Sequence, residues 1–433
     1  MAENKYVMVQ AVDMRGVSRG KIIPASEQRA AQEYGVGFGA AALYGMGLGP
    51  ETPELLARIA PTTATRLPWD QTITRFAASI FSDGRPHEYC PRNVLQKVIA
   101  QAEKDGYRLM IGVEPEHHLV IQDEQGNIKP WDPHHNEVGD RLAFSLRMTI
   151  ASTSYMTTVM QWLDTLGWGC FVAEKEEGPA QYEINWKHAD ALTTTDRLAF
   201  FKLLANKAAE DLGAKATFMA KPFPDRTGSG LHFHCHLENL DGENLFLDPN
   251  EQFGLSIIGK HFIAGVMHRA SALCAVTNPT VNCYQRLHAR NEDTKSGCTW
   301  APHRVTWGGN NRTVMTRVPA PGRIEDRSPS PNCNPYLAIA CYLSAGLDGI
   351  KKSMVPEGPV LGNTYTMVGF KGKILPEKLQ DAAKALIEDE VLLDTLGPLH
   401  KELVVWQHEQ ASQFSGHRET FPQTMYDQFL QLF

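Results

Sequence analysis

Alternating apolar and polar residues predict strands at the start of the chain. Residues 6–13 (YVMVQAVD) and 17–24 (VSRGKIIP) flank the turn signal Arg15-Gly16. A period of two on both sides of a turn predicts a β-hairpin. Residues 34–50 follow, rich in glycine and without a charged side chain. This segment is either a packed, mobile loop or a surface that closes against another one.

The period changes to that of a helix after Pro91. Apolar residues fall on one helical face, and Gly106 stands where a helix commonly ends. We therefore predict a helix over residues 92–105 and a domain boundary at its start. The chain divides into a β-rich unit, residues 1–90, and a larger unit, residues 91–433.

Short alternating segments are interleaved with long helical ones in the larger unit. This order predicts an α+β or α/β fold with a largely antiparallel sheet. The expected strands are 108–116, 181–186, 216–223, 230–237, 312–319 and 323–328, and the expected helices are 195–212, 251–276 and 335–351.

Composition narrows the classes of partner. The 433 residues contain 42 lysines and arginines against 49 aspartates and glutamates, a net charge of −7, without a basic run. Nucleic acid and membrane surfaces are therefore not expected partners. The chain starts without the features of a secretory signal, and its longest apolar stretch, residues 336–347, is too short to cross a bilayer. With eight singly spaced cysteines, this predicts a cytoplasmic protein with reduced thiols.

Charged side chains recur at a period of two on three of the expected strands. Each pattern alone is typical of the solvent side of a half-buried strand, because residues i and i+2 share a face. Three such strands together indicate a shared polar cavity, to which an acidic stretch adds Glu176 and Glu183. The three rows are Glu114 and Glu116; His232, His234 and His236; and Arg323, Glu325 and Arg327.

This set of side chains favours hard divalent cations. Buried carboxylates need cations nearby, and carboxylates with few imidazoles and no ordered cysteines favour Mg²⁺ or Mn²⁺ over zinc. Several arginines would complement the ions, because guanidinium forks grip phosphate and carboxylate oxygens. Together they indicate phosphoryl transfer from a nucleotide, although each arginine alone could be a surface ion pair. The arginines are Arg286, Arg312, Arg317, Arg323 and Arg327.

Several strings in the chain resemble the signatures of the glutamine synthetase family, in the same order. GVEPEHHLV is similar to G-x-E-x-E-F-F, EEGPAQYEI to E-x-x-P-G-Q-x-E, and KPFPDRTGSGLHFHCHL to K-P-x-x…G-S-G-x-H-x-H. The resemblance runs from about residue 6 to residue 397. The string SGCTWAPHRVTWGGNNRT is most similar to the branch that contains γ-glutamylmethylamide synthetases and type III glutamine synthetase-like enzymes.

The resemblance implies roles for individual residues. Two or three Mg²⁺ or Mn²⁺ ions are expected, one held by Glu114, His232 and Glu325, another by Glu116, Glu176 and Glu183. Arg312 would lie at the transferring phosphoryl group and, with Glu325, count as catalytic. Trp186 would either stack on adenine or be a core indole. The remaining implied nucleotide-binding residues are Arg317, Arg323, His234 and His236, and those around glutamate are Gly228, His232, Arg286 and Arg327.

The resemblance also implies a reaction, a fold and an assembly. The γ-carboxylate of L-glutamate would attack the terminal phosphate of ATP, and an amine would then displace phosphate from γ-glutamyl phosphate. The fold would be a small β-grasp-like domain before a larger catalytic domain with a curved antiparallel sheet flanked by helices. Family members form stacked hexameric rings, so a dodecamer is expected. Its active sites would lie between subunits, with residues 34–50 packed against the neighbouring chain.

The chain departs from ammonia-using relatives at two places. Those relatives carry aspartates in F-D-G-S-S and S-D-M, where this chain has FGAAA at 38–42 and YGM at 44–46. Their lid string G-Y-E-A-P corresponds to HARNEDTKSGCTWAP at 288–302, where Glu292 is the candidate for the lid carboxylate. An uncharged pocket favours a carbon substituent, so we predict methylamine or another small amine as the acceptor. The alternatives are ammonia, a larger or aromatic amine, a kinase that stops at the phosphate, and a non-catalytic relative.

Overall fold

The computed structural model describes residues 3–132, 141–414 and 423–430. Its first part is a seven-stranded sheet with the order β2-β1-β6-β4-β3, in which β5 and β7 also pair with β6. The predicted hairpin is confirmed, since β1 pairs antiparallel with β2. The elements are β1 (Tyr6–Val12), β2 (Ser18–Pro24), α1 (Gln28–Glu33), β3 (Val36–Phe38), β4 (Leu55–Ile59), β5 (Thr65–Leu67), β6 (Asp70–Ser82) and β7 (Arg85–Pro86).

The amino-terminal sheet has its own apolar core and a polar contact with the rest of the chain. Val7, Phe76 and Ile80 are in a separate cluster of buried side chains. Helix α2 (Pro91–Lys104) follows, close to the predicted bounds, with proline in its first turn. Arg92 of this helix makes a two-pronged ion pair with the buried Asp196 of the larger unit, at 3.0 and 2.9 Å. The two parts are joined by Arg75 of β6, which donates to the Asp196 carbonyl oxygen at 3.2 Å, and by Arg92, which donates to the Ser79 hydroxyl at 2.9 Å.

Two further sheets form the centre of the molecule. One has the order β13-β8-β15-β18-β17-β16 and the other β10-β9-β12-β11, with β14 also paired to β9. All of these pairings are antiparallel except that of β16 with β17. The strands are β8 (Arg108–Pro115), β9 (His117–Gln122), β10 (Ile128–Pro130), β11 (Cys170–Lys175), β12 (Gln181–Trp186), β13 (Ala189–Asp190), β14 (Lys215–Thr217), β15 (Leu231–Glu238), β16 (Trp307–Gly308), β17 (Thr316–Ala320) and β18 (Arg323–Asp326).

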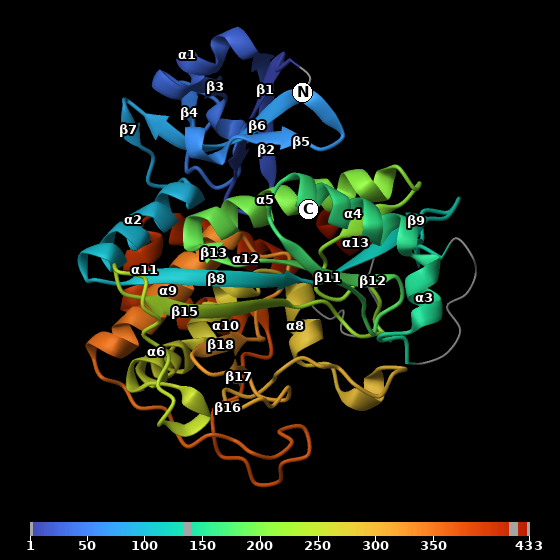
Figure 1. The fold of residues 1–433 in the computed structure, drawn as a ribbon, viewed down its shortest axis with the longest axis vertical. Helices are drawn as coiled ribbons and strands as arrows, with labels where there is room; N and C mark the ends of the chain where they lie inside the picture. Colours follow the sequence, from blue (N-terminus) through green and yellow to red (C-terminus); the bar gives the residue numbers. More distant parts are fainter. Residues whose placement is uncertain (1–2, 133–140, 415–422, 431–433) are drawn as a thin grey trace.

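Helices cover these sheets, and the predicted α+β class is confirmed. Figure 1 shows α5 between the amino-terminal sheet and β8, and α9 behind β8 and β15. Helices α6 and α9 approach closely at Gly265, which has no side chain. A Cβ at this position would lie only 2.2 Å from the carbonyl oxygen of Ala345. The helices are α3 (Leu146–Ala151), α4 (Thr153–Thr165), α5 (Ala191–Glu210), α6 (Ile257–His268), α7 (Ala270–Thr277), α8 (Val281–Leu287), α9 (Pro335–Lys351), α10 (Leu379–Ile387), α11 (Glu390–Leu396), α12 (Leu399–Gln413) and α13 (Gln423–Phe429).

Three predicted elements are wrong in extent. The helix expected over 251–276 is a 3₁₀ turn followed by α6 and α7. The two helices separate at Arg269, whose side chain pairs with Asp348 at 2.8 Å and Asp389 at 3.3 Å. The strand expected over 216–223 ends at Thr217, before the donor-less Pro222. The strand expected over 312–319 begins only at Thr316. No described helix is long and apolar enough to cross a membrane.

Candidate active site

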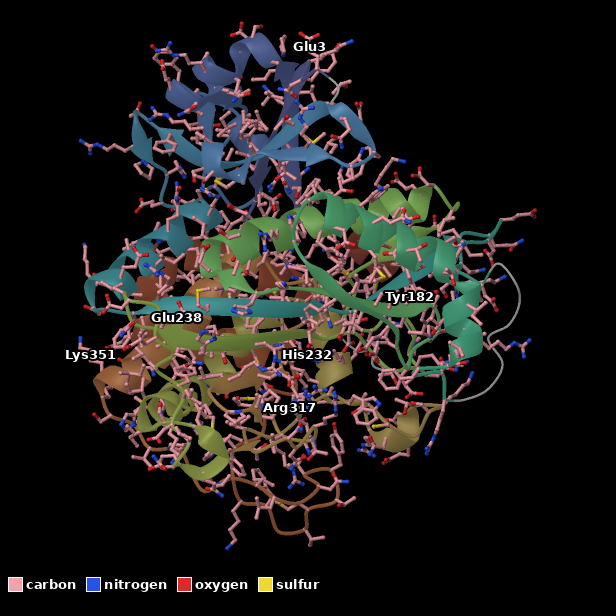
Figure 2. The ribbon with its side chains drawn as sticks, in the orientation of Figure 1. Glu3, Tyr182, His232, Glu238, Arg317 and Lys351 are labelled. Carbon is pink, nitrogen blue, oxygen red and sulfur yellow. The ribbon has the colours of Figure 1, made fainter. Side chains whose placement is uncertain are left out.

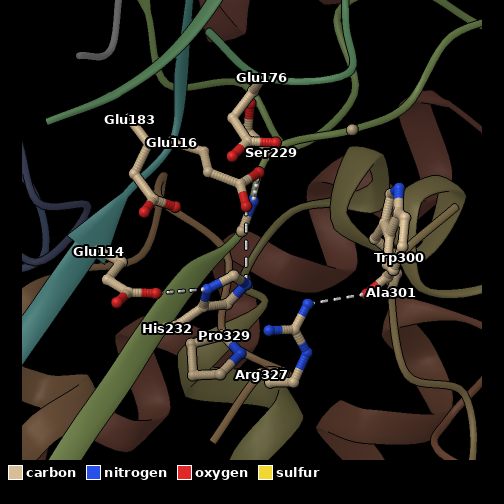
Figure 3. A network of polar contacts seen from close by, with 12 residues as sticks. Glu114, Glu116, Glu176, Glu183, Ser229, His232, Trp300, Ala301, Arg327 and Pro329 are labelled. Carbon is tan, nitrogen blue, oxygen red and sulfur yellow. Dashed lines mark hydrogen bonds and ion pairs between the residues drawn. The ribbon is translucent and has the colours of Figure 1, made fainter. Parts of the chain in front are cut away.

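The three charged rows face one another across neighbouring strands. In the registers of β15 with β8 and β18, His232 lies opposite Glu114 and His234 opposite Glu325. The polar rows that were predicted separately on each strand therefore form one continuous polar patch across three strands. Figure 2 shows His232 and Arg317 near the middle of the molecule, and Figure 3 shows the acidic side chains gathered around His232.

Two overlapping triads could hold metal ions. Glu114, Glu183 and His232 place ligand atoms within 4.8 Å of one another, and so do Glu114, His234 and Glu325. The resemblance grouped Glu114 with His232 and Glu325 and left His234 to the nucleotide. In the structure Glu114 belongs to both triads, and Glu325 Oε1 lies 3.6 Å from His232 Nδ1 and 3.8 Å from His234 Nε2, so His234 joins the expected set as a further candidate ligand. This partition could not be read from the strands alone, because it depends on which rotamers the packed side chains adopt.

The histidines of the patch suit cation binding. His232 Nδ1 lies 3.2 Å from Glu114 Oε2. Burial, then the charge of Arg327, lowers the pKa of His232 to about 4, so its imidazole is neutral at neutral pH and offers a lone pair. His234 Nε2 lies 3.0 Å from Glu114 Oε1 but outside hydrogen-bond geometry, and neither of its ring nitrogens has a hydrogen-bond partner among the described residues. A buried imidazole that lies beside carboxylates without a hydrogen bond to them fits a cation ligand.

Glu116 is fixed by the loop before β15. Its Oε2 accepts hydrogen bonds from the Gly230 N–H at 2.8 Å and the Gln181 side-chain amide at 3.0 Å. Burial, reinforced by the charge of Glu176, raises the pKa of Glu116 to about 8. Burial also raises the pKa of Glu176, with Glu174 nearby, and raises the pKa of Glu183 well above its ordinary value. Glu116 therefore favours its protonated form at neutral pH, burial pushes the other two carboxyls in the same direction, and a divalent cation would displace such protons.

Glu114 and Glu325, the other two carboxyls among the predicted metal ligands, have lowered pKa values. Burial alone would raise both pKa values, but the neighbouring histidines hold the pKa of Glu114 below its usual range. For Glu325 the opposing charges of Arg327 and the two histidines lower the pKa to about 2. The patch therefore combines two carboxyls with lowered pKa values, Glu114 and Glu325, and three with raised pKa values, Glu116, Glu176 and Glu183.

Two arginines bind Glu325 rather than standing free. Arg327 Nη1 donates to Glu325 Oε1 at 2.7 Å, and Arg317 Nε pairs with Glu325 Oε2. Arg317 also donates to Asn310 Oδ1 at 2.8 Å. The Nε of Arg327, a residue only 3% exposed, has no hydrogen-bond partner among the described residues, so this arginine keeps a donor for an anionic ligand. Figure 3 shows Arg327 between His232 and the segment of Trp300.

Arg286 braces the backbone at this end of the site. Its guanidinium donates to the carbonyl oxygens of Ser328 at 3.0 Å, Pro329 at 3.1 Å and Arg327 at 2.9 Å. Arg286 was predicted to contact glutamate directly, but its guanidinium already makes these three hydrogen bonds to backbone carbonyls. Gly228 lies against the same side chain, and a Cβ there would also lie 2.3 Å from the carbonyl oxygen of Ala220. Only glycine fits there, because the Ala220 backbone and the Arg286 side chain lie so close.

A cavity of about 410 Å³ adjoins Glu114 on the sheet. Among the predicted nucleotide residues, His234, His236, Arg323 and Trp186 line it. Trp186 is only 3% exposed and packs against Trp168 and Phe201, with ring centroids 5.5 and 4.8 Å away, so the core-indole interpretation is favoured. His236 Nε2 lies 3.2 Å from Glu238 Oε1. The cavity residues are Gly112, Val113, Glu114, Phe171, Trp186, His188, His234, His236, Asn244, Ala320, Pro321, Gly322 and Arg323.

Two predicted catalytic residues lie at the margin of the site. Arg312 is exposed. It lies near Glu174, whose pKa is raised by burial and by the charge of Glu114, and the charge of Arg312 partly opposes this rise. Glu292 is 72% exposed at its side chain and lies 4.0 Å from Arg290. It contacts none of the metal-site carboxylates in the described part of the chain. The structure therefore does not bring Glu292 into the site.

Several site residues escaped the sequence reasoning. Phe171 is 62% exposed and lines the cavity, so it offers the open aromatic face that Trp186 lacks. Gln181 links Glu116 to the Gly228 carbonyl oxygen at 3.1 Å. Its place inside the EEGPAQYE string was the available signal. For Phe171, one residue into an unremarkable strand, the sequence carried no signal.

Comparisons with known proteins agree with this geometry. Residues 88–416 match the family model "Glutamine synthetase, catalytic domain". A glutamine synthetase of Rhizobium meliloti (strain 1021) is 39% identical over 401 residues, covering 91% of this chain and 89% of that protein. A glutamate–methylamine ligase of Methyloversatilis universalis is 35% identical over 437 residues, covering 98% and 96%. A solved GmaS–ADP complex superposes with a TM-score of 0.90 at 34% identity, covering 98% of this chain and 96% of that one.

Proposed function

The chain belongs to the glutamine synthetase family, near its GmaS branch, and is an ATP-dependent glutamate ligase; we propose that its acceptor is a small alkylamine, methylamine first. The observation that carries the proposal is the uncharged segment 38–46, where ammonia-using relatives are expected to carry two aspartates. The 35% identity to a glutamate–methylamine ligase over almost the whole chain supports it. The product would be γ-glutamylmethylamide.

The carboxylate patch would hold two or three Mg²⁺ or Mn²⁺ ions. The two triads around Glu114 supply ligands for them, and the protonated Glu116 and Glu183 fit a site that is charged only when loaded. When bound, the cations would neutralise the phosphate oxygens of ATP and the charge that develops during transfer. The family is generally dependent on ATP and divalent metals.

The protein side chains would position both substrates. Arg327, whose Nε has no partner within residues 3–132, 141–414 and 423–430, and the backbone at Gly228 would hold glutamate. Arg323 and the cavity beside Glu114 would hold ATP. A γ-carboxylate oxygen attacks the terminal phosphorus, and the bond from phosphorus to the ADP oxygen breaks. The amine, after losing one proton to a carboxylate, attacks the acyl carbon. Phosphate leaves with the bonding pair, and the nitrogen loses its second proton.

An amine panel tests the acceptor. The values of kcat/KM for ammonium, methylammonium, ethylammonium and an aromatic amine would be compared at fixed glutamate and ATP. We expect methylammonium to give the highest value. A preference of more than tenfold for ammonium would contradict the proposal and favour glutamine synthesis. Acyl phosphate trapped by hydroxylamine, without an amide from any amine, would favour a carboxylate kinase.

We also propose assembly as a dodecamer of two hexameric rings with active sites between subunits. The uncharged segment 34–50 supports this, because Tyr34 is 68% exposed and free to contact a neighbouring chain, whereas Leu43 and Met46 anchor the segment inside its own subunit. Light scattering is expected to give a mass near twelve chains, and mixing wild-type with inactive subunits should lower activity more than in proportion. A monomer with full activity would contradict this assembly.

A further inference from the structure

Trp300 has an unusual backbone beside the proposed glutamate site. Its φ is +57°, a left-handed conformation that a bulky residue rarely adopts. It is also 40% exposed, so neither burial of the ring nor an ordinary turn explains it. Strained backbones of this kind concentrate at binding and catalytic sites.

Hydrogen bonds on both sides hold this conformation. The carbonyl of Trp300 accepts from Arg327 Nη2 at 3.3 Å, and the carbonyl of Ala301 accepts from the Tyr365 hydroxyl at 3.2 Å. The Cys298 carbonyl accepts from the hydroxyls of Thr227, Thr294 and Ser296 at 3.1 to 3.2 Å. The ring is therefore carried on a braced segment, tied to the arginine that also binds Glu325.

The segment of Trp300 is tied to the proposed glutamate site through Arg327. Figure 3 shows Arg327 between the acidic side chains around His232 and the indole of Trp300. Burial, and the charge of Glu177, raise the pKa of the Cys298 thiol, which places this segment beside the turn between β11 and β12. The exposed ring therefore stands on a segment that contacts both Arg327 and the region of Glu177.

The same segment brings no carboxylate to meet an ammonium ion. Its acidic residues are Glu292 and Asp293. Glu292 faces solvent, and Asp293 accepts from the Arg290 N–H at 3.1 Å. A cation at this place would find an aromatic face, and such faces attract alkylammonium groups through the ring quadrupole and contact with the carbon.

We propose that Trp300 is a specificity-determining residue that binds the alkylammonium form of the acceptor against its ring, so that methylammonium is selected over ammonium. This inference rests on the proposed ligase function and deepens it. A bare ammonium ion has no carbon to place on the ring and gains less from the contact, whereas a methyl group fills the space over the indole.

Three variants of the whole enzyme test the proposal: Trp300→Phe, Trp300→Leu and the control Phe370→Leu, which removes a different aromatic ring, one that lies under the Arg304 guanidinium at 4.6 Å. The readout is the ratio of kcat/KM for methylammonium to that for ammonium, with the KM values for glutamate and ATP. We expect Trp300→Leu to lower the ratio about three- to tenfold, Trp300→Phe to retain most of it, and Phe370→Leu to leave it unchanged.

The outcomes separate this inference from the ligase proposal. An unchanged ratio in Trp300→Leu would overturn the role of Trp300 while leaving the ligase proposal intact. A loss that is equal for both amines, with a raised KM for glutamate, would also overturn it, because the ring would then serve glutamate. Wild-type enzyme that makes no amide with any amine would refute the proposed function itself.

Discussion

Glu325 joins the metal site to the arginines. It is fully buried, belongs to a triad with Glu114 and His234, and pairs with Arg317 and Arg327. Changing it to glutamine keeps the shape but removes the charge. We expect Glu325→Gln to lower glutamate-dependent ADP release at least about hundredfold, with an unchanged circular dichroism spectrum.

The control for this change is Glu210→Gln, at the exposed end of α5. It should keep wild-type activity. Retention of more than a few percent of activity in Glu325→Gln, after trace metal is controlled, would contradict the assigned role of Glu325.

Arg327 is the residue best placed to recognise a carboxylate of glutamate. It is buried, and its Nε has no hydrogen-bond partner among the described residues. A lysine keeps the charge but lacks the planar fork. We expect Arg327→Lys to raise the KM for glutamate about tenfold or more in initial-rate assays, with a smaller change in the KM for ATP. Equal changes in both KM values would argue against this role.

Helix packing behind the site depends on small residues. A Cβ on Gly265 of α6 would lie 2.2 Å from the Ala345 carbonyl oxygen on α9, and backbone cannot move aside at low cost. We expect Gly265→Ala to destabilise the protein by about 2 kcal/mol, seen as a lower Tm. Gly362→Ala is the control, since no heavy atom lies within 4 Å of its ideal Cβ. Equal Tm values for the two variants would contradict this packing argument.

At the scale of helices and strands, the sequence predicted elements with a regular apolar pattern well, but it did not predict where a helix or strand is interrupted. The bounds of α9 and the charged rows of β8, β15 and β18 follow directly from local pattern. The break at Arg269 depends on Asp348 and Asp389, which lie 79 and 120 residues further along the chain. Likewise, the sharing of Glu114 between two triads depends on strand register and rotamers, which no local pattern contains.

The left-handed Trp300 shows the same limit at a single position. Its conformation depends on Arg327, 27 residues later. Motif resemblance drew attention to the nearby Glu292 instead, because a lid carboxylate was expected in that segment. Phe171, which lines the cavity beside Glu114, is found only when the strands are assembled, whereas Gln181 had a signal in the EEGPAQYE string.

For the molecule as a whole, metal binding and stability should depend on pH together. The pKa of Glu116 in the folded protein is raised to about 8, above its unfolded value. Between these two pKa values the folded state binds more protons than the unfolded state, so the metal-free protein should lose stability as pH rises toward 8. Burial acts on Glu176 and Glu183 in the same direction.

Thermal unfolding of the metal-free protein checks this expectation. The Tm should fall between pH 5.5 and pH 8, and added Mn²⁺ should raise it more at pH 8 than at pH 5.5, because the cation replaces protons. Glu116→Gln should flatten part of this dependence. A Tm that rises over this range without metal would contradict the protonated state of the patch.

The stoichiometry of the reaction tests the central claim most directly. With wild-type enzyme, Mg²⁺, L-glutamate, ATP and methylamine, ADP and γ-glutamylmethylamide would be quantified in the same samples over time. The structure and the family predict one amide formed for each ADP released, and no ADP release without glutamate. ADP released without amide, or amide formed without ATP, would contradict the ligase mechanism.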